Sequence, residues 1–177
     1  SSELRTIAHP HMLGLNKRLN ETIQLATLQR TEVFFVDAVE GTKALKVSSR
    51  AGTRHPAHCT SVGKALLAEC PRDVLLELYP SNRLPHVTTR SITSRKQLLA
   101  ELETTRERGY AVNLGELEDG IGSVACVIRD RDDRVRAAIG IGAPISRLAD
   151  NWLDEFTPQA VETAQQIGMD LATDKTT

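Results

Sequence analysis

The sequence predicts an α+β fold in which an antiparallel sheet is flanked by helices. Apolar residues recur at helical spacing near both ends of the chain, and segments rich in β-branched residues lie between them. Short polar turns join the strand-like segments, which is typical of antiparallel pairing. With 177 residues, the chain has the length of one domain with its own hydrophobic core.

The first third of the chain predicts a helix, a hairpin and a loop. Residues 12–28 carry apolar side chains at helical spacing and predict an amphipathic helix. Residues 33–39 are β-branched and aromatic, and residues 44–48 alternate apolar and polar side chains beyond a turn at 40–42. Together these two runs predict a β-hairpin. Residues 50–56 contain glycine and proline and predict a loop.

Two short helices are predicted after this loop. The hydroxyls of Thr60 and Ser61 suit the N-cap of a helix that continues through Ala68. Pro71 suits the start of a second helix over residues 72–78. The chain is therefore predicted to place two hydroxyl groups at a helix start.

A loop and a longer helix follow. Residues 81–92 predict the loop, and Thr93 or Ser94 is a suitable N-cap for a helix that runs to Arg108. Gly109 is a natural left-handed terminator of that helix.

The last third predicts strands and a closing helix. Residues 110–112 lead into an acidic, glycine-bearing segment, 113–122. Residues 123–129 and 135–142 predict two strands joined by a polar turn. Thr157 and Pro158 predict the cap and first turn of the closing helix.

Composition excludes several functions. Lys and Arg number 22 and Asp and Glu number 23, so the net charge of -1 argues against nucleic-acid binding by this chain alone. Aromatic residues make up only 3%, which argues against base stacking. No apolar run reaches the roughly 18 residues of a membrane span, and the first residues do not resemble a signal peptide. We therefore expect a cytoplasmic protein without membrane contact.

A cluster of possible metal ligands, His55, His58 and Cys59, is incomplete. A structural zinc site needs about four ligands with a second, separated pair, and neither Cys70 nor Cys126 supplies one. The sequence therefore predicts neither a metal site nor a cofactor.

Phosphate-binding and dinucleotide-binding motifs are also incomplete. Gly63 and Lys64 are followed by Ala65, where a phosphate loop needs Ser or Thr. Gly120 and Gly122 precede a strand rather than the helix that a dinucleotide site requires.

Two glycines in a predicted strand indicate space. Alternation places Ile139 and Ile141 on one face and leaves Gly140 and Gly142 on the other. A closely packed helix is one explanation and a ligand is another. Because the helix start at Thr60 offers hydroxyls and backbone N–H groups, we predict a modest pocket with one polar, anion-binding wall.

Four ordered blocks resemble a known family. The residues that carry the resemblance are 50–68, 108–111 with Glu116 and Gly120, 124–127, and 137–147. They resemble the effector-binding domain of IclR-type bacterial transcription regulators, over about residues 8–172.

The resemblance implies a domain related to GAF and PAS sensors, with about six antiparallel strands. It further implies a homodimer or homotetramer whose operator DNA is bound only through a winged helix-turn-helix domain on another part of the protein. On this basis residues 1–10 are expected to be the residual linker from that domain. Residues 11–174 are then the effector-binding domain and 175–177 a tail.

The family's ligand positions carry over to ten residues of this sequence, to which Thr60 is added for its place at the helix start. The ten are Ala44, Val47, His55, Ser61, Val62, Asn113, Ile121, Ser123, Gly140 and Gly142. In the family that this sequence resembles, many members have serines where Gly140 and Gly142 stand. The glycines widen the pocket, so we expect an organic acid larger than a small keto acid, either aromatic or dicarboxylic.

Two alternatives remain open. A GAF-like thiol-dependent enzyme would use Cys59 or Cys126, although no resolving cysteine is close in sequence to either. A dimerisation module without a ligand would fill the predicted pocket with side chains.

Overall fold

A computed structural model describes residues 2–172, so the predicted tail at 175–177 lies outside the described residues. Six strands form one antiparallel sheet in the order β3-β2-β1-β6-β5-β4. The strands are β1 (Thr22–Gln29), β2 (Glu32–Val39), β3 (Arg54–Pro56), β4 (Ala111–Leu114), β5 (Ile121–Arg129) and β6 (Val135–Pro144). The helices are α1 (Ser2–Leu19), α2 (Ser61–Leu67), α3 (Arg72–Leu78), α4 (Arg95–Arg108) and α5 (Trp152–Asp170). The predicted α+β class and the sheet flanked by helices are confirmed.

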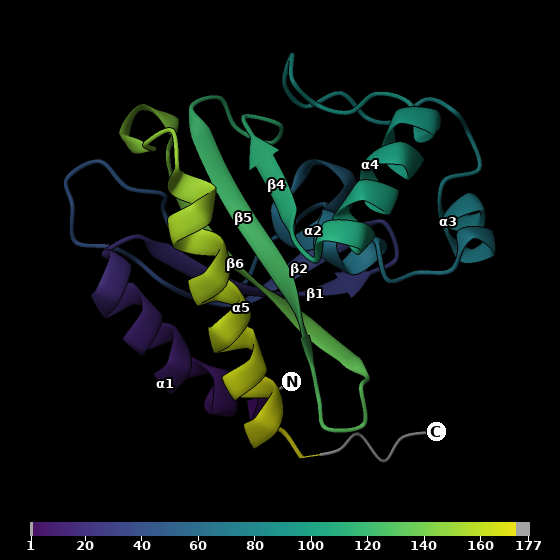
Figure 1. The fold of residues 1–177 in the computed structure, drawn as a ribbon. Coiled ribbons are helices and arrows are strands. Elements are labelled where there is room, and N and C mark those ends of the chain that lie inside the picture. The colour runs from purple at the N-terminus through teal and green to yellow at the C-terminus, as the bar shows by residue number, and fades with distance from the viewer. Residues whose placement is uncertain (1, 173–177) are drawn as a thin grey trace.

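The helices cover the two faces of the sheet unequally. In Figure 1, α1 and α5 lie side by side on one face, whereas α2 lies behind the sheet with α4 beyond it. Short α3 lies at the outer edge of this second layer. The sheet is thus the middle of three layers.

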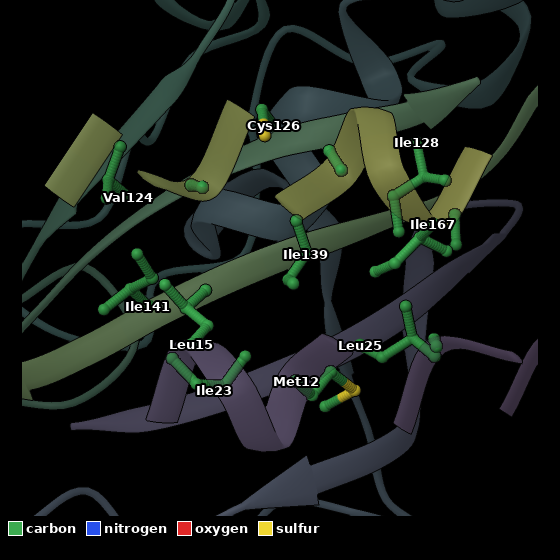
Figure 2. Packing of buried hydrophobic residues seen from close by; sticks show 14 of the residues in the cluster. Met12, Leu15, Ile23, Leu25, Val124, Cys126, Ile128, Ile139, Ile141 and Ile167 are labelled. Carbon is green, nitrogen blue, oxygen red and sulfur yellow. The ribbon is translucent and has the colours of Figure 1, made fainter. Parts of the chain in front are cut away.

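The core between the sheet and the pair α1 and α5 is almost entirely aliphatic. Met12 and Leu15 of α1 meet Ile23 of β1, and Ile167 of α5 closes the core from above (Figure 2). All four side chains are fully buried. Burial of this apolar surface is the main contribution that holds both helices on the sheet.

The alternation in β6 has the predicted consequence. Ile139 and Ile141 are fully buried in the core beneath α5. Gly140 and Gly142 face the opposite way, where a Cβ added to Gly140 would lie 3.1 Å from Val62 of α2. Gly140 therefore lies directly under α2, whereas Gly142 faces Val47.

The helix predicted over residues 12–28 is wrong at both ends, because α1 already begins at Ser2 and the second half of the predicted range is not helical. Helix α1 ends at Leu19, and Asn20 adopts a left-handed conformation with φ of 51°. Beyond it, Thr22–Gln29 forms β1, in which Ile23 and Leu25 alternate with Gln24. The apolar residues of β1 happen to continue the helical spacing of α1. Pairing of β1 with β2 and β6 makes this segment a strand.

The predicted hairpin between residues 33–39 and 44–48 is also wrong. Strand β2 pairs with β1 through a tight turn at Arg30 and Thr31, and β1 pairs on its other side with β6. The free edge of β2 is occupied by Arg54–Pro56 as β3, which was predicted to be loop. Residues 44–48 form an irregular connection instead of a strand.

The acidic, glycine-bearing segment, residues 113–122, is partly β-strand. Residues 113–114 belong to β4 and residues 121–122 to β5, and these two strands pair with each other. Pairing of the flanking strands extends into the segment from both sides, which leaves 115–120 as the connection.

The closing helix begins five residues before its predicted cap, at Trp152 rather than at Thr157. Pro158 therefore lies inside α5. Trp152 and Phe156, one helical turn apart, bury their rings in the core at a centroid distance of 5.9 Å. This burial outweighs the roughly 3 kcal/mol that an internal proline costs a helix.

The remaining helices begin and end as predicted. Thr60 caps α2, Ser94 caps α4, and Gly109 ends α4 in the left-handed region at φ of 85°. Helix α1 runs through the expected boundary between residues 10 and 11, and its Leu4 and Ala8 are buried in the core.

Candidate functional site

A cavity lies between the glycine face of the sheet and the start of α2. It is bounded by β1, β2, β5 and β6, by the loop before β3, and by the connection between β4 and β5. Its lining residues are Gln24, Phe35, Val47, Arg50, Thr60, Ser61, Val62, Asn113, Leu117, Glu118, Ile121, Ser123, Gly140 and Gly142.

The start of α2 forms one wall of the cavity. The Thr60 hydroxyl accepts a hydrogen bond from the Gly63 backbone N–H at 2.9 Å, which satisfies one unpaired donor of the first turn. Gly63 lies very close to the 3₁₀ turn Ala57–Cys59, and an added Cβ would be 2.1 Å from the carbonyl oxygen of Ala57. This close approach fixes the position of Ser61 and Val62 over the sheet.

Hydroxyl and amide groups connect α2 to the sheet. Ser123 of β5 donates to the Ser61 hydroxyl at 2.7 Å. The Asn113 amide donates to the carbonyl oxygen of Cys59 at 3.3 Å and accepts from the Glu116 N–H at 2.8 Å. The wall is therefore polar, and its side chains are held by hydrogen bonds within the protein.

Charged side chains lie at the mouth of the cavity. The Arg50 Nη2 is 2.8 Å from the Glu118 Oε2. The backbone N–H of Arg50 donates to the Gln24 side-chain oxygen at 3.0 Å, which holds the loop against β1. The ion pair between Arg50 and Glu118 joins two loops, and the two residues are 68 positions apart in sequence.

The segment that carries Val47 is held by a buried carboxylate. Glu21 forms an ion pair with Arg147 at 2.8 Å and another with Lys43 at 3.0 Å. Arg147 also donates to the Leu45 carbonyl at 2.7 Å. The Val47 carbonyl accepts from the Thr22 hydroxyl at 2.6 Å, so Val47 is fixed against Gly142.

The cavity is narrow in this conformation. Its empty volume, mouth included, is about 450 Å³, but only about 40 Å³ admits the centre of a water molecule. A ring-sized ligand therefore requires the mouth residues to move.

The structure brings together nine of the eleven residues predicted for the site. Val47, Thr60, Ser61, Val62, Asn113, Ile121, Ser123, Gly140 and Gly142 line the cavity. Ala44 is exposed on the irregular connection and does not line it. His55 lies outside the lining, where its ring contacts Phe35 edge to face at 5.7 Å.

Five lining residues were missed. Gln24 lies on β1, which was predicted as helix. Phe35 lies on β2, whose cavity-facing residues were not predicted. Alternation in β1 would have found Gln24. Arg50, Leu117 and Glu118 come from loops, and nothing in the local sequence signals that the two loops meet.

His55 does not line the cavity, but it interacts electrostatically with Arg50, which does. Burial, and then the neighbouring Arg50 guanidinium, lower the pKa of His55 below its usual 6.5. His55 is therefore neutral at neutral pH, and Arg50 is the cation on this side of the cavity.

The cysteines do not form a reactive site. Burial raises the pKa of Cys59 to about 11 and that of Cys126 to about 12. A catalytic thiol needs the opposite shift together with exposure.

Thiol labelling tests this arrangement. Because Cys59 and Cys126 are buried with raised pKa values, we expect half-buried Cys70 to react first with a disulfide reagent in the folded protein at pH 7.5. Cys59 and Cys126 should react after unfolding in urea. Because the unfolded chain releases these thiol protons near pH 9 and the folded chain retains them, stability should fall as pH rises from 9 to about 11. Rapid native labelling of Cys59 or Cys126 would contradict the structure.

Residues 2–172 hold neither a metal-binding cluster nor a membrane-spanning helix. No group of three or more His, Cys, Asp or Glu side chains is arranged to hold a metal ion. No helix within this range is long and apolar enough to cross a membrane.

The helix-flanked antiparallel sheet and the cavity beneath α2 define a class of small-molecule sensor domains. A family model described as "Bacterial transcriptional regulator IclR C-terminal" matches residues 1–169. The chain therefore belongs to the IclR family of bacterial transcriptional regulators and is its effector-binding domain.

Relatives support this assignment in sequence. The transcriptional regulator XynR of Escherichia coli is 33% identical over 97% of this chain and 67% of that protein. The repressor IclR of Escherichia coli is 30% identical over 94% of this chain and 62% of that protein. The chain thus spans about three fifths to two thirds of the length of these relatives, which are transcriptional regulators and not enzymes.

Solved structures support it in three dimensions. The IclR protein of Thermotoga maritima superposes with a TM-score of 0.86 at 32% identity, over 93% of this chain and 67% of that chain. An IclR homologue from Microbacterium hydrocarbonoxydans, solved in complex with 4-hydroxybenzoate, gives a TM-score of 0.83 at 28% identity, over 93% of this chain and 66% of that chain.

Proposed function

We propose that the cavity binds a small organic acid, aromatic or dicarboxylic, and that its occupancy changes operator binding by a winged helix-turn-helix domain of the full-length regulator. The observation that carries the proposal is the cavity itself, which combines the bare face of Gly140 and Gly142 with the hydroxyls of Ser61 and Ser123. Apolar space with a few fixed polar groups is typical of small-molecule sites.

The proposed ligand class follows from the shape of the cavity. Gly140 and Gly142 keep the floor free of side chains, so a flat ring or an extended chain would lie against β6 once Val62 and the mouth residues move away from it. The structural relative that was solved with 4-hydroxybenzoate supports an aromatic acid. The loops that carry Arg50 and Glu118 would have to part to admit it.

The proposed mechanism is a shift of population. A ligand that reorders residues 50–56 and 115–120 biases the arrangement of subunits in a homodimer or homotetramer, and thereby the affinity for operator DNA. Tenfold control requires about 1.4 kcal/mol of differential affinity, which one or two hydrogen bonds supply.

A ligand panel tests the proposal. We expect 4-hydroxybenzoate or adipate to raise the melting temperature by about 5–10 °C at one hundred times its Kd, and pyruvate and glyoxylate to have little effect. Gly142→Val should abolish the shift, because its Cβ would lie 3.5 Å from Val47 and its methyl groups would fill the cavity without a backbone clash. Tight binding of pyruvate or glyoxylate, with no binding of the larger acids, would refute the ligand class.

A further inference from the structure

Two side chains of opposite charge lie among the cavity-lining residues. Arg50 is the one cation of the lining and Glu118 the one anion, and their charged atoms are 2.8 Å apart. The other polar lining side chains are uncharged. They are Gln24, Thr60, Ser61, Asn113 and Ser123.

The uncharged groups are largely engaged within the protein. Asn113 uses its amide nitrogen and its oxygen on backbone groups, and Ser61 and Ser123 bond to each other. An arginine side chain has five N–H donors. Among residues 2–172, the one hydrogen bond of the Arg50 guanidinium goes to Glu118. Arg50 therefore has the largest unused capacity to bind an anion.

The two partners differ in exposure. The Arg50 side chain is 17% exposed, whereas the Glu118 side chain is 57% exposed. Releasing an already solvated carboxylate costs little, because exposed ion pairs contribute little. A partly buried guanidinium gains more from an anion held close to it in two parallel hydrogen bonds.

We propose that Arg50 binds the carboxylate of the effector and that Glu118 occupies the same guanidinium in the ligand-free protein. This inference rests on the proposed function and names the residue that recognises the acid. One ion pair breaks and another forms, and no proton moves. The exchange detaches the 115–120 connection from the loop before β3, so the charge of the ligand itself opens the link between the two loops.

Matched charged and uncharged probes test the inference by calorimetry. The probes are 4-hydroxybenzoate and 4-hydroxybenzamide, and if another acid binds more tightly, that acid and its primary amide replace them. We expect Arg50→Gln to weaken binding of the acid about tenfold or more and to leave binding of the amide within about twofold. Glu118→Gln should strengthen binding of the acid about threefold, because it removes a competing carboxylate.

Two further variants serve as controls. Asp133→Asn breaks an ion pair with Arg129 at the distant β5–β6 turn and should change neither affinity. Arg50→Lys keeps the charge but loses the planar fork, so the affinity for the acid should lie between those of wild type and Arg50→Gln.

The outcomes separate the two proposals. Equal effects of Arg50→Gln on acid and amide, or no effect on either, would overturn the role of Arg50 and leave the proposed function intact. Failure of wild-type protein to bind any acid of the panel would overturn the proposed function and this inference with it. Selective loss of the acid supports both.

Discussion

Gly63→Ala is expected to destabilise the domain by about 3 kcal/mol or more. An added Cβ would lie 2.1 Å from the carbonyl oxygen of Ala57 and 2.5 Å from its Cα. Both are backbone atoms, so relief of the clash must move α2 away from the 3₁₀ turn. That movement would also displace Ser61 and Val62 from the cavity, and effector binding should weaken with stability.

A second glycine provides the control for this substitution. Gly14 lies inside α1, where an added Cβ would meet only the end of the Arg18 side chain, at 3.6 Å. Gly14→Ala should therefore stabilise the domain by about 0.5–1 kcal/mol through helix propensity. Propensity alone predicts the same gain for both positions. Urea unfolding followed by circular dichroism distinguishes them, and a stabilised Gly63→Ala variant would show that the close approach in α2 is incorrect.

Gly63 also illustrates what sequence patterns could and could not predict. In sequence Gly63 is part of an incomplete phosphate loop, because Ala65 stands where Ser or Thr is needed. Its actual role is contact with Ala57, which no local pattern reveals. The N-caps Thr60 and Ser94 were predictable, because capping depends on a residue and the next few backbone groups.

Some parts of the candidate site were likewise predictable from local sequence patterns, and others were not. The floor formed by Gly140 and Gly142 followed from alternation within one strand, because strand periodicity is local. Arg50 and Glu118 meet even though β3 and β4 are the opposite edge strands of the sheet, because the loop before β3 and the connection after β4 both reach over the cavity. Strand order was in turn obscured because β1 continued the apolar spacing of α1.

Beneath the cavity, Lys64 of α2 is fully buried with its charge compensated by Glu116. The Lys64 Nζ is 3.0 Å from both carboxylate oxygens of Glu116 and donates to the Val112 carbonyl. Glu101 of α4 contributes a longer ion pair at 3.6 Å. The Lys64 side chain is 1% exposed and that of Glu116 12%. This network joins the helix start to the connection that carries Leu117 and Glu118, so it supports two walls of the cavity.

Removing one partner of this pair is expected to be among the most costly changes in the domain. Glu116→Leu leaves the Lys64 ammonium buried without its nearest carboxylate, which typically costs about 3–5 kcal/mol. Adding Lys64→Met should restore much of the loss, because a matched apolar pair carries no desolvation penalty. Glu101→Gln is the control and should cost less than about 1 kcal/mol, since that carboxylate is more distant and 32% exposed.

The double variant separates a charge effect from a packing effect. If the cost of Glu116→Leu came from packing, Lys64→Met/Glu116→Leu would be at least as unstable as the single variant in urea unfolding. If it comes from the Lys64 charge left without its nearest carboxylate, the coupling energy between the two positions will be favourable and large. A restored fold also allows effector binding to be measured in the absence of the ion pair. Retained binding there would show that the pair supports the cavity through stability alone, whereas lost binding would show that the charges themselves hold the 115–120 connection in place.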